Sequence, residues 1–178
     1  MGKIENVYLE CYDNKVAQLQ ALFLMFLYTV IYDSANNQML HNVFADCRRI
    51  YMRAILDFFS NKKKGDDLNY KDFINTETNF EIQGVGNIRT LTNKQTAHFT
   101  KKRGTFRGAE NKYADVVKQL IDRISCFMRE LDQNVTDRYR QEYQDASVQE
   151  LRSVVLAQLC KIYILNMGNS DWDKRDMS

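Results

Sequence analysis

The sequence predicts an all-α protein, folded as one bundle of four to five helices. The chain of 178 residues contains no proline, and five of its seven glycines fall between residues 65 and 108. Proline and glycine interrupt helices, so their scarcity elsewhere favours long helices joined by short connections. The length and the 44% hydrophobic content suit one domain with a real core. We therefore expect a single helical domain over residues 1–178, with residues 168–178 as a flexible tail.

The first half of the chain predicts two long helices. A helix is expected over residues 14–34, because residues 21–31 form an unbroken apolar run. Eleven residues fall short of the roughly 20 that span a bilayer, so this run predicts a buried core helix and no membrane contact. Polar residues 33–37 supply a break and an N-cap for a second helix over residues 38–60. Its apolar residues recur by threes and fours and predict one buried face: Leu40, Val43, Phe44, Cys47, Ile50, Tyr51, Ile55, Phe58 and Phe59.

The second half predicts three further helices and two polar connections. Residues 61–87 form a polar connection, in which residues 70–73 predict one short helix. A helix over residues 88–101 carries His98, and a basic, glycine-marked loop over residues 102–108 follows. Two amphipathic helices are expected over residues 110–134 and 148–167, with residues 135–146 as a short helix joined to the last one. Ser147 and Glu150 have the spacing of a capping box at the start of that helix.

Several functional classes leave signatures that this sequence lacks. The chain has two histidines and four dispersed cysteines, which do not form a familiar zinc pattern. It has neither a glycine-rich phosphate loop nor a GxSxG segment. We expect no metal and no cofactor, and we interpret the Asp66-Asp67 pair as solvated carboxylates in a polar loop.

The cysteines and the N-terminus indicate the compartment. The cysteines Cys11, Cys47, Cys126 and Cys160 include no CxxC pair, and three of them lie in helical apolar patterns. We interpret these thiols as buried and reduced, as in a cytoplasmic protein. The first ten residues lack the apolar stretch of a secretory signal, which supports the same location.

The net charge of the chain does not indicate a nucleic-acid-binding protein, but one local cluster of basic residues does. The net charge is only +2, but four basic residues follow His98 closely: Lys101, Lys102, Arg103 and Arg107. They are candidate RNA-binding residues. The alternative is that they, like the basic run at residues 62–64, simply face water.

The helix around His98 could support RNA cleavage without a metal. On a helix, Lys94 lies one turn before His98 and Leu91 two turns before it, so His98 should be partly buried beside a cation. A histidine with a pKa near 6.5 can take the proton of a ribose 2′-OH or protonate the leaving oxygen. One chain offers a single suitable histidine, so this chemistry predicts a homodimer. The alternative is a hydrogen-bonded histidine of the core or of an interface.

Three segments resemble HEPN-domain proteins. Residues 93–98, Asn-Lys-Gln-Thr-Ala-His, resemble their NKxxAH motif. Residues 53–59, Arg-Ala-Ile-Leu-Asp-Phe-Phe, resemble the R-x-L-[IL]-D-F-F helix of a bacterial branch of HEPN-like proteins. In that branch an acidic "DD…DF" segment follows, and here Asp66-Asp67 and Asp72-Phe73 stand in its place. The segments come in the expected order, and the resemblance covers roughly residues 40–103, a little over a third of the chain.

The resemblance implies an all-α, HEPN-like bundle of four to five helices that dimerises through its motif-bearing helices. It also implies an RNA-binding protein or a metal-independent endoribonuclease of a defence or toxin–antitoxin type system. The partners that it implies are RNA, a second copy of the chain, and a protein such as an antitoxin or a nucleotidyltransferase. The catalytic candidates are His98, Lys94 and Asn93.

The match departs from the usual nuclease motif, because Asn93 stands where that motif has arginine. Lys94 could replace the cation as a point charge, and Arg53 could supply the missing guanidinium from the neighbouring helix. The alternative for Arg53 is a surface ion pair with Asp57, four residues later.

Two other functions stay open. The chain could be a non-catalytic helical interaction module of the same fold: an antitoxin, an inhibitor or an assembly subunit. It could also be an unrelated helical enzyme or ligand-binding bundle, which a large apolar cavity would favour.

Overall fold

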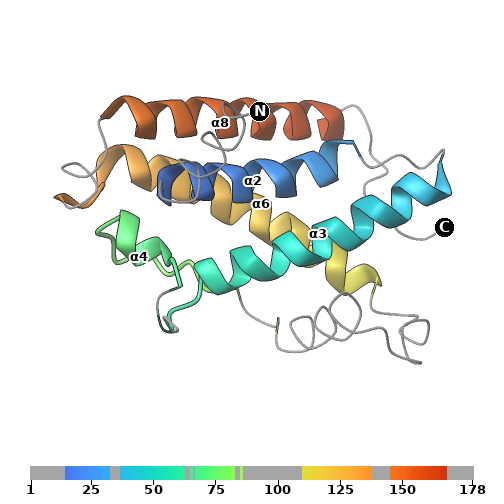
Figure 1. Cartoon of the computed structure of the whole chain (residues 1–178), viewed down its shortest axis with the longest axis horizontal. Helices are drawn as coiled ribbons and strands as arrows, with labels where there is room; N and C mark the ends of the chain where they lie inside the picture. The colour runs from blue at the N-terminus through green and yellow to red at the C-terminus, as the bar shows by residue number, and fades with distance from the viewer. Residues whose placement is uncertain are drawn as a thin grey trace, which may run out of the picture.

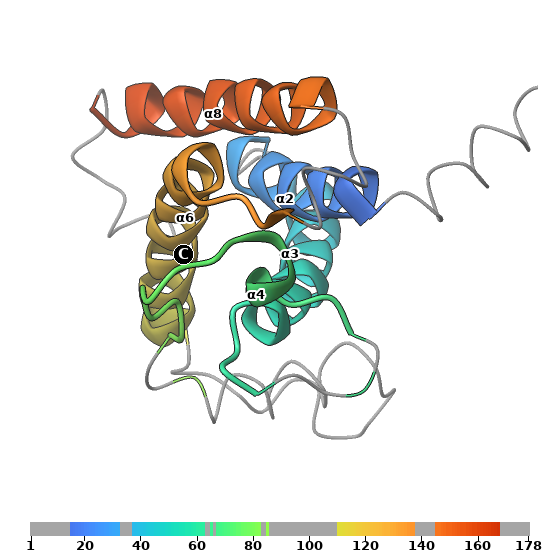
Figure 2. The ribbon, with the colours of Figure 1, turned by 90° about the vertical axis from the view of Figure 1, so that its left-hand side faces the viewer.

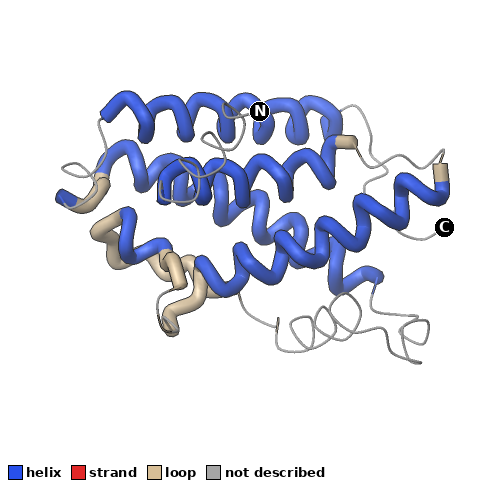
Figure 3. Tube along the Cα trace, viewed as in Figure 1, coloured by secondary structure: helices blue, strands red, loops and turns tan. Residues whose placement is uncertain are grey.

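The predicted all-α class is confirmed by the computed structural model, which describes residues 15–32, 37–62, 65, 67–82, 85, 110–137 and 145–167. In these residues the chain forms α-helices and no strand (Figure 3). The helices are α2 (Lys15–Ile31), α3 (Gln38–Phe58), α4 (Tyr70–Phe73), α6 (Glu110–Gln133) and α8 (Asp145–Met167). None of these described helices is long and apolar enough to cross a lipid bilayer.

The four long helices pack as a closed ring. Helix α2 contacts α3 and α8, and α6 contacts the same two helices from the other side. Figure 1 shows α8 as the outer layer above α2 and α6, with α3 below them. In Figure 2 the short helix α4 lies between α3 and α6, on the side away from α8.

Phenylalanine side chains fill the space between the long helices. Phe127 of α6 is fully buried, and its ring meets five others edge-on, with centroids 5.4–6.3 Å apart. The partner rings come from four different segments of the chain: Phe23, Phe58, Phe59, Phe73 and Phe80. Edge-to-face pairs of this kind stabilise a core beyond the area that they bury.

Helix α2 is a core helix, as its unbroken apolar run predicts. Phe23, Phe26 and Leu27 are fully buried between α3 and α8. Near its C-terminus the guanidinium Nη2 of Arg48 donates to the carbonyl oxygen of Thr29 at 3.0 Å. That carbonyl belongs to the last turn, where no intrahelical partner exists. Arg48 of α3 therefore caps α2 and ties the two helices together.

Asn69 joins the end of α3 to the start of α4. Its amide nitrogen donates to the carbonyl oxygens of Phe58 at 3.0 Å and Ser60 at 2.7 Å. Its side-chain oxygen accepts from the backbone N–H of Lys71, while a carboxylate oxygen of Asp72 accepts from the Asn69 N–H. This capping box confirms the short helix predicted at residues 70–73.

The predicted buried face of α3 is wrong for three of its residues. Leu40, Val43 and Ile50 are about half exposed, whereas Ile55 and Phe59 are fully buried. For Leu40 and Val43, Figure 1 shows the reason, because the first turns of α3, to which they belong, run out past the end of α2. The helix starts as predicted, with Asn37 as the N-cap whose side chain accepts from the N–H groups of Met39 and Leu40.

The predicted start of the last helix is also wrong. Helix α8 starts at Asp145, so Ser147 lies inside its first turn and does not cap it. Of the short helix predicted over residues 135–146, Val135 and Thr136 are not helical, and residues 138–144 lie outside the described residues. The thiol of Cys160 is exposed where burial was expected, and Cys47 and Cys126 are partly buried.

Candidate functional site

Most of the predicted site residues lie outside the described residues. These are His98, Lys94 and Asn93, the predicted helix over residues 88–101, and the basic residues Lys101, Lys102, Arg103 and Arg107. Asp66 also lies outside them, and Asp67 is exposed. Arg53 is the catalytic candidate that the described part of the chain contains.

Arg53 lies on the outer face of α3. Its side chain is 45% exposed, and its Nε lies 3.7 Å from a carboxylate oxygen of Asp57, four residues later. This is the ion pair that the i,i+4 spacing predicts. Such an exposed pair is worth only about 0.3–0.5 kcal/mol, so it orients the guanidinium more than it stabilises the fold. The guanidinium is therefore accessible to a phosphate group from solvent.

Arg49 has a different role, although it stands one turn before Arg53. Its Nη1 lies 2.7 Å from a carboxylate oxygen of Asp46, and its guanidinium carbon lies 5.7 Å from the ring centre of Tyr113. Tyr113 belongs to α6, so Arg49 links α3 to α6 through a cation–π contact. Of these two arginines, Arg53 is the more exposed, and its ion-pair partner Asp57 lies on its own helix, so it is the candidate ligand group.

The RAILDFF and DF segments mostly build structure. Phe58, Phe59 and Phe73 are buried in the core, and Asp72 completes the capping box of α4. Arg53 and Asp57 form an ion pair at the surface of α3, with side chains 45% and 30% exposed. The residues that the motif brings to the surface are therefore this pair.

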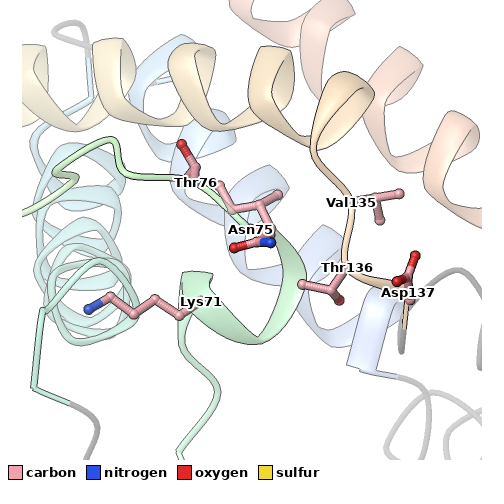
Figure 4. A pocket seen from close by; sticks show the side chains of 7 residues that line it. Lys71, Asn75, Thr76, Val135, Thr136 and Asp137 are labelled. Carbon is pink, nitrogen blue, oxygen red and sulfur yellow. The ribbon is translucent and has the colours of Figure 1, made fainter.

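A polar pocket lies where the chain leaves α4 and α6, and sequence reasoning missed it. An antiparallel bridge between Ile74 and Val135 joins the two segments, and the Thr136 N–H donates to the Phe73 carbonyl at 2.9 Å. The pocket has a volume of about 320 Å³. Figure 4 shows its lining: Lys71, Ile74, Asn75, Thr76, Val135, Thr136 and Asp137. Ile74 and Val135 are far apart in sequence, and neither segment carries a local signal for the bridge.

The pocket can hold a small polar molecule but offers little for catalysis. Lys71 and Asp137 are exposed and lie on opposite sides of it in Figure 4. The hydroxyl of Thr136 donates to the Asp72 carbonyl at 3.2 Å, and that of Thr76 accepts from the Thr78 N–H at 3.1 Å. Both hydroxyls are thus engaged within the protein, and no charged group of the lining is buried.

The buried phenol of Tyr70 belongs to a structural network. Its hydroxyl donates to the side-chain oxygen of Asn61 at 2.9 Å, and the Asn61 amide donates to Glu81 at 3.0 Å and Asn79 at 3.2 Å. Burial raises the pKa of the Tyr70 phenol above its ordinary value of 10.0, and the nearby Glu81 carboxylate raises it further. Tyr70 therefore stays neutral at physiological pH and serves as a hydrogen-bond donor.

In the described part of the chain, no three histidine, cysteine or acidic side chains gather closely enough to hold a metal ion. Comparison with protein-family models, curated proteins and solved structures finds no match to this chain. The resemblance to HEPN proteins therefore depends on the three sequence segments.

Proposed function

We propose that this chain is a HEPN-like protein that acts on RNA in the cytoplasm as a homodimer, as a metal-independent ribonuclease of a defence or toxin–antitoxin type system. The observation that supports the proposal best is the division of the RAILDFF segment. Its phenylalanines build the core, whereas Arg53 stands half-exposed on the outer face of α3, held by Asp57. The fold does not require this guanidinium, and phosphate binding would explain why an arginine stands at this position.

In the proposed reaction, the ribose 2′-oxygen attacks the adjacent phosphorus. His98 of one subunit takes the proton of the 2′-hydroxyl as the new P–O2′ bond forms. His98 of the partner subunit protonates the 5′-oxygen as the P–O5′ bond breaks. The products are a 2′,3′-cyclic phosphate and a 5′-hydroxyl, and no metal or oxidant is needed.

Three side chains would stabilise the charged phosphorane. Lys94 supplies a point charge one turn from His98, and Asn93 can donate hydrogen bonds to a phosphate oxygen. The usual motif has an arginine at the position of Asn93, and Arg53 supplies the planar guanidinium in its place. The basic residues Lys101, Lys102, Arg103 and Arg107 would bind neighbouring phosphates, so RNA affinity should fall steeply with salt.

The test is cleavage of end-labelled RNA by the full chain in the presence of EDTA. We expect cleavage that leaves a 2′,3′-cyclic phosphate and that His98→Ala abolishes. His41→Ala is the matched control, because His41 is the other histidine of the chain and lies in α3. Cleavage that survives His98→Ala would remove His98 as the catalyst, and cleavage that EDTA abolishes would indicate a metal enzyme.

A second function is favoured by the exposed apolar residues at the start of α3. Met39, Leu40 and Val43 are exposed side by side, as on a helix that binds another protein. The chain would then be a non-catalytic interaction module: an antitoxin, an inhibitor or an assembly subunit, with a protein such as a nucleotidyltransferase as its partner. A folded chain that neither cleaves nor binds RNA would favour this function.

A further inference from the structure

Residues 75–82, which follow α4, lie on the helix bundle in the manner of a single β-strand. Every second residue of this segment is exposed, and the residues between are partly or fully buried. The exposed residues are Asn75, Glu77, Asn79 and Glu81, and the covered ones are Thr76, Thr78, Phe80 and Ile82. This alternation is typical of an extended chain that lays one face on a core. Figure 2 shows the segment running from α4 toward α6.

The segment is held in place along its length. The antiparallel bridge to the end of α6 fixes its start. In its middle, the Thr78 hydroxyl donates to a carboxylate oxygen of Glu130 at 3.2 Å. Near its end, the Asn61 amide donates to the side-chain oxygens of Asn79 at 3.2 Å and Glu81 at 3.0 Å. A binding partner would therefore meet a segment that already has its bound shape, which lowers the entropic cost of binding.

The backbone of this segment has an edge with no strand beside it. The Asn75 N–H donates to the Asn134 carbonyl at 2.8 Å, but Asp137 is already helical, so the paired stretch ends there. In an antiparallel pair, successive residues point their backbone groups to opposite sides, so those of Thr76 and Thr78 point away from the bridge. In the described part of the chain, no backbone group pairs with the Thr76 N–H or with the carbonyls of Thr76 and Thr78. Such an edge is a template for another extended chain.

The charges around this edge, which we call the strand edge (residues 75–79), select a basic partner. Glu77 and Glu81 are exposed on the outer face of the segment, and Asp137 is exposed beside the bridge. Lys71 is the basic residue among those that line the adjoining pocket or lie in the segment. Three carboxylates against one ammonium attract a chain rich in lysine or arginine and repel the phosphates of RNA.

We propose that the strand edge binds an extended, basic segment of a partner protein, which adds to it as a β-strand. Backbone groups of the partner pair with the Thr76 N–H and with the carbonyls of Thr76 and Thr78, and its basic side chains meet Glu77 and Glu81. In an extended chain these two glutamates lie on one face, roughly 13 Å apart, so the matching basic residues stand four positions apart. No step of the proposed RNA chemistry uses this segment, so the inference is independent of that function.

The test uses a fluorescein-labelled decapeptide of alternating lysine and threonine, and fluorescence anisotropy measures its binding to the full chain. Threonine favours an extended backbone, and the lysines match the acidic side chains. Two matched peptides carry N-methyl groups on the lysine nitrogens or on the threonine nitrogens. They keep the charge but remove the hydrogen-bond donors along one edge. We expect at least one of them to bind at least about tenfold more weakly than the parent peptide.

Variants of the protein locate the site. Glu77→Lys should weaken binding of the parent peptide at least about fivefold, because it replaces an attraction by a repulsion. Glu150→Lys is the matched control, because it makes the same charge change at an exposed position of α8 and should leave the affinity unchanged. Thr76→Pro removes the N–H of the strand edge and should also weaken binding. Circular dichroism checks that each variant is folded, and Glu77→Lys keeps the test valid if Thr76→Pro is not.

Four results would overturn the inference. Equal affinity for the parent and both methylated peptides would mean that charge alone attracts the peptide. Equal affinity for the Glu77→Lys and Glu150→Lys proteins would place the peptide elsewhere. A parent peptide that does not bind at millimolar concentration would exclude the added strand. A short RNA that displaces the peptide would mean that the edge binds nucleic acid and not a protein.

Discussion

At the scale of single residues, two of the three arginines of α3, Arg49 and Arg53, differ in what they contact. Arg49 bridges to Asp46 and to the Tyr113 ring of α6, whereas Arg53 meets Asp57 on its own helix. Both arginines fit the same helical spacing, so their different surroundings could not be predicted from the sequence. The difference depends on which side of α3 faces α6.

Arg53→Ala should leave the fold intact and weaken RNA binding. The Arg53–Asp57 pair is exposed, so its loss should change the free energy of unfolding by no more than about 0.5 kcal/mol. Urea denaturation measures this change, and a filter-binding assay measures RNA affinity. Arg49→Ala is the contrasting variant, since it also removes the contact with Tyr113. Equal RNA affinity for wild type and Arg53→Ala would exclude a role for this guanidinium.

Tyr70→Phe should cost stability and also change its dependence on pH. The variant loses the buried hydrogen bond to Asn61, worth about 1 kcal/mol. In the wild type the folded phenol has a raised pKa, so the unfolded chain loses its proton first as pH rises. The stabilising contribution is thus present below about pH 10 and is lost above it. Urea denaturation below and above that pH should show that raising the pH lowers the free energy of unfolding less in Tyr70→Phe than in the wild type.

At the scale of elements, the short helix α4 depends on one asparagine. Asn69→Ala should lower the free energy of unfolding by about 2–4 kcal/mol, because it removes an N-cap and leaves two carbonyl oxygens at the end of α3 without their donor. Asn75→Ala is the control, since Asn75 is exposed and bonds to Asn134 through its backbone. Equal urea midpoints for the two variants would show that Asn69 does not hold these elements together.

The elements themselves could largely be predicted from the sequence. The apolar run of residues 21–31 predicts the core helix α2, and the three-and-four spacing predicts α3 and α6 with nearly correct ends. Which half of α3 is buried could not be predicted, because Val43 and Ile50 have the same spacing as the buried Ile55 and Phe59. Burial depends on how far α2 and α6 extend beside α3, which is a property of the packed helices and not of local pattern.

At the scale of the whole molecule, one aromatic cluster joins α2, α3, α4 and α6. Phe127→Ala should destabilise the chain by about 3–5 kcal/mol, because it leaves a cavity beside five other rings. Phe106→Ala is a chemical control for the loss of a phenylalanine in the basic loop predicted over residues 102–108. A thermal melt of both variants checks this, and a loss below about 1 kcal/mol for Phe127→Ala would contradict the central role of the cluster.

The candidate site was less predictable than the fold. Local spacing could predict the Arg53–Asp57 pair, because four residues apart on a helix means one turn apart in space. The polar pocket forms where Ile74 pairs with Val135. The apolar residues Met39, Leu40 and Val43 are exposed because the described helices that pack on α3 do not cover them. Both depend on contacts between distant segments, which no local pattern encodes. His98 and Lys94 stay predictions from the NKxxAH segment.

The central claim is that two chains together enclose one RNA. The most direct measurement is the mass of the complex, by light scattering after gel filtration, of His98→Ala protein mixed with a short labelled RNA of random sequence. This variant is used so that the RNA stays uncut. We predict a complex of two chains and one RNA, whose formation weakens in high salt. A complex of one chain with one RNA, or a protein that elutes free of RNA at low salt, would contradict the claim.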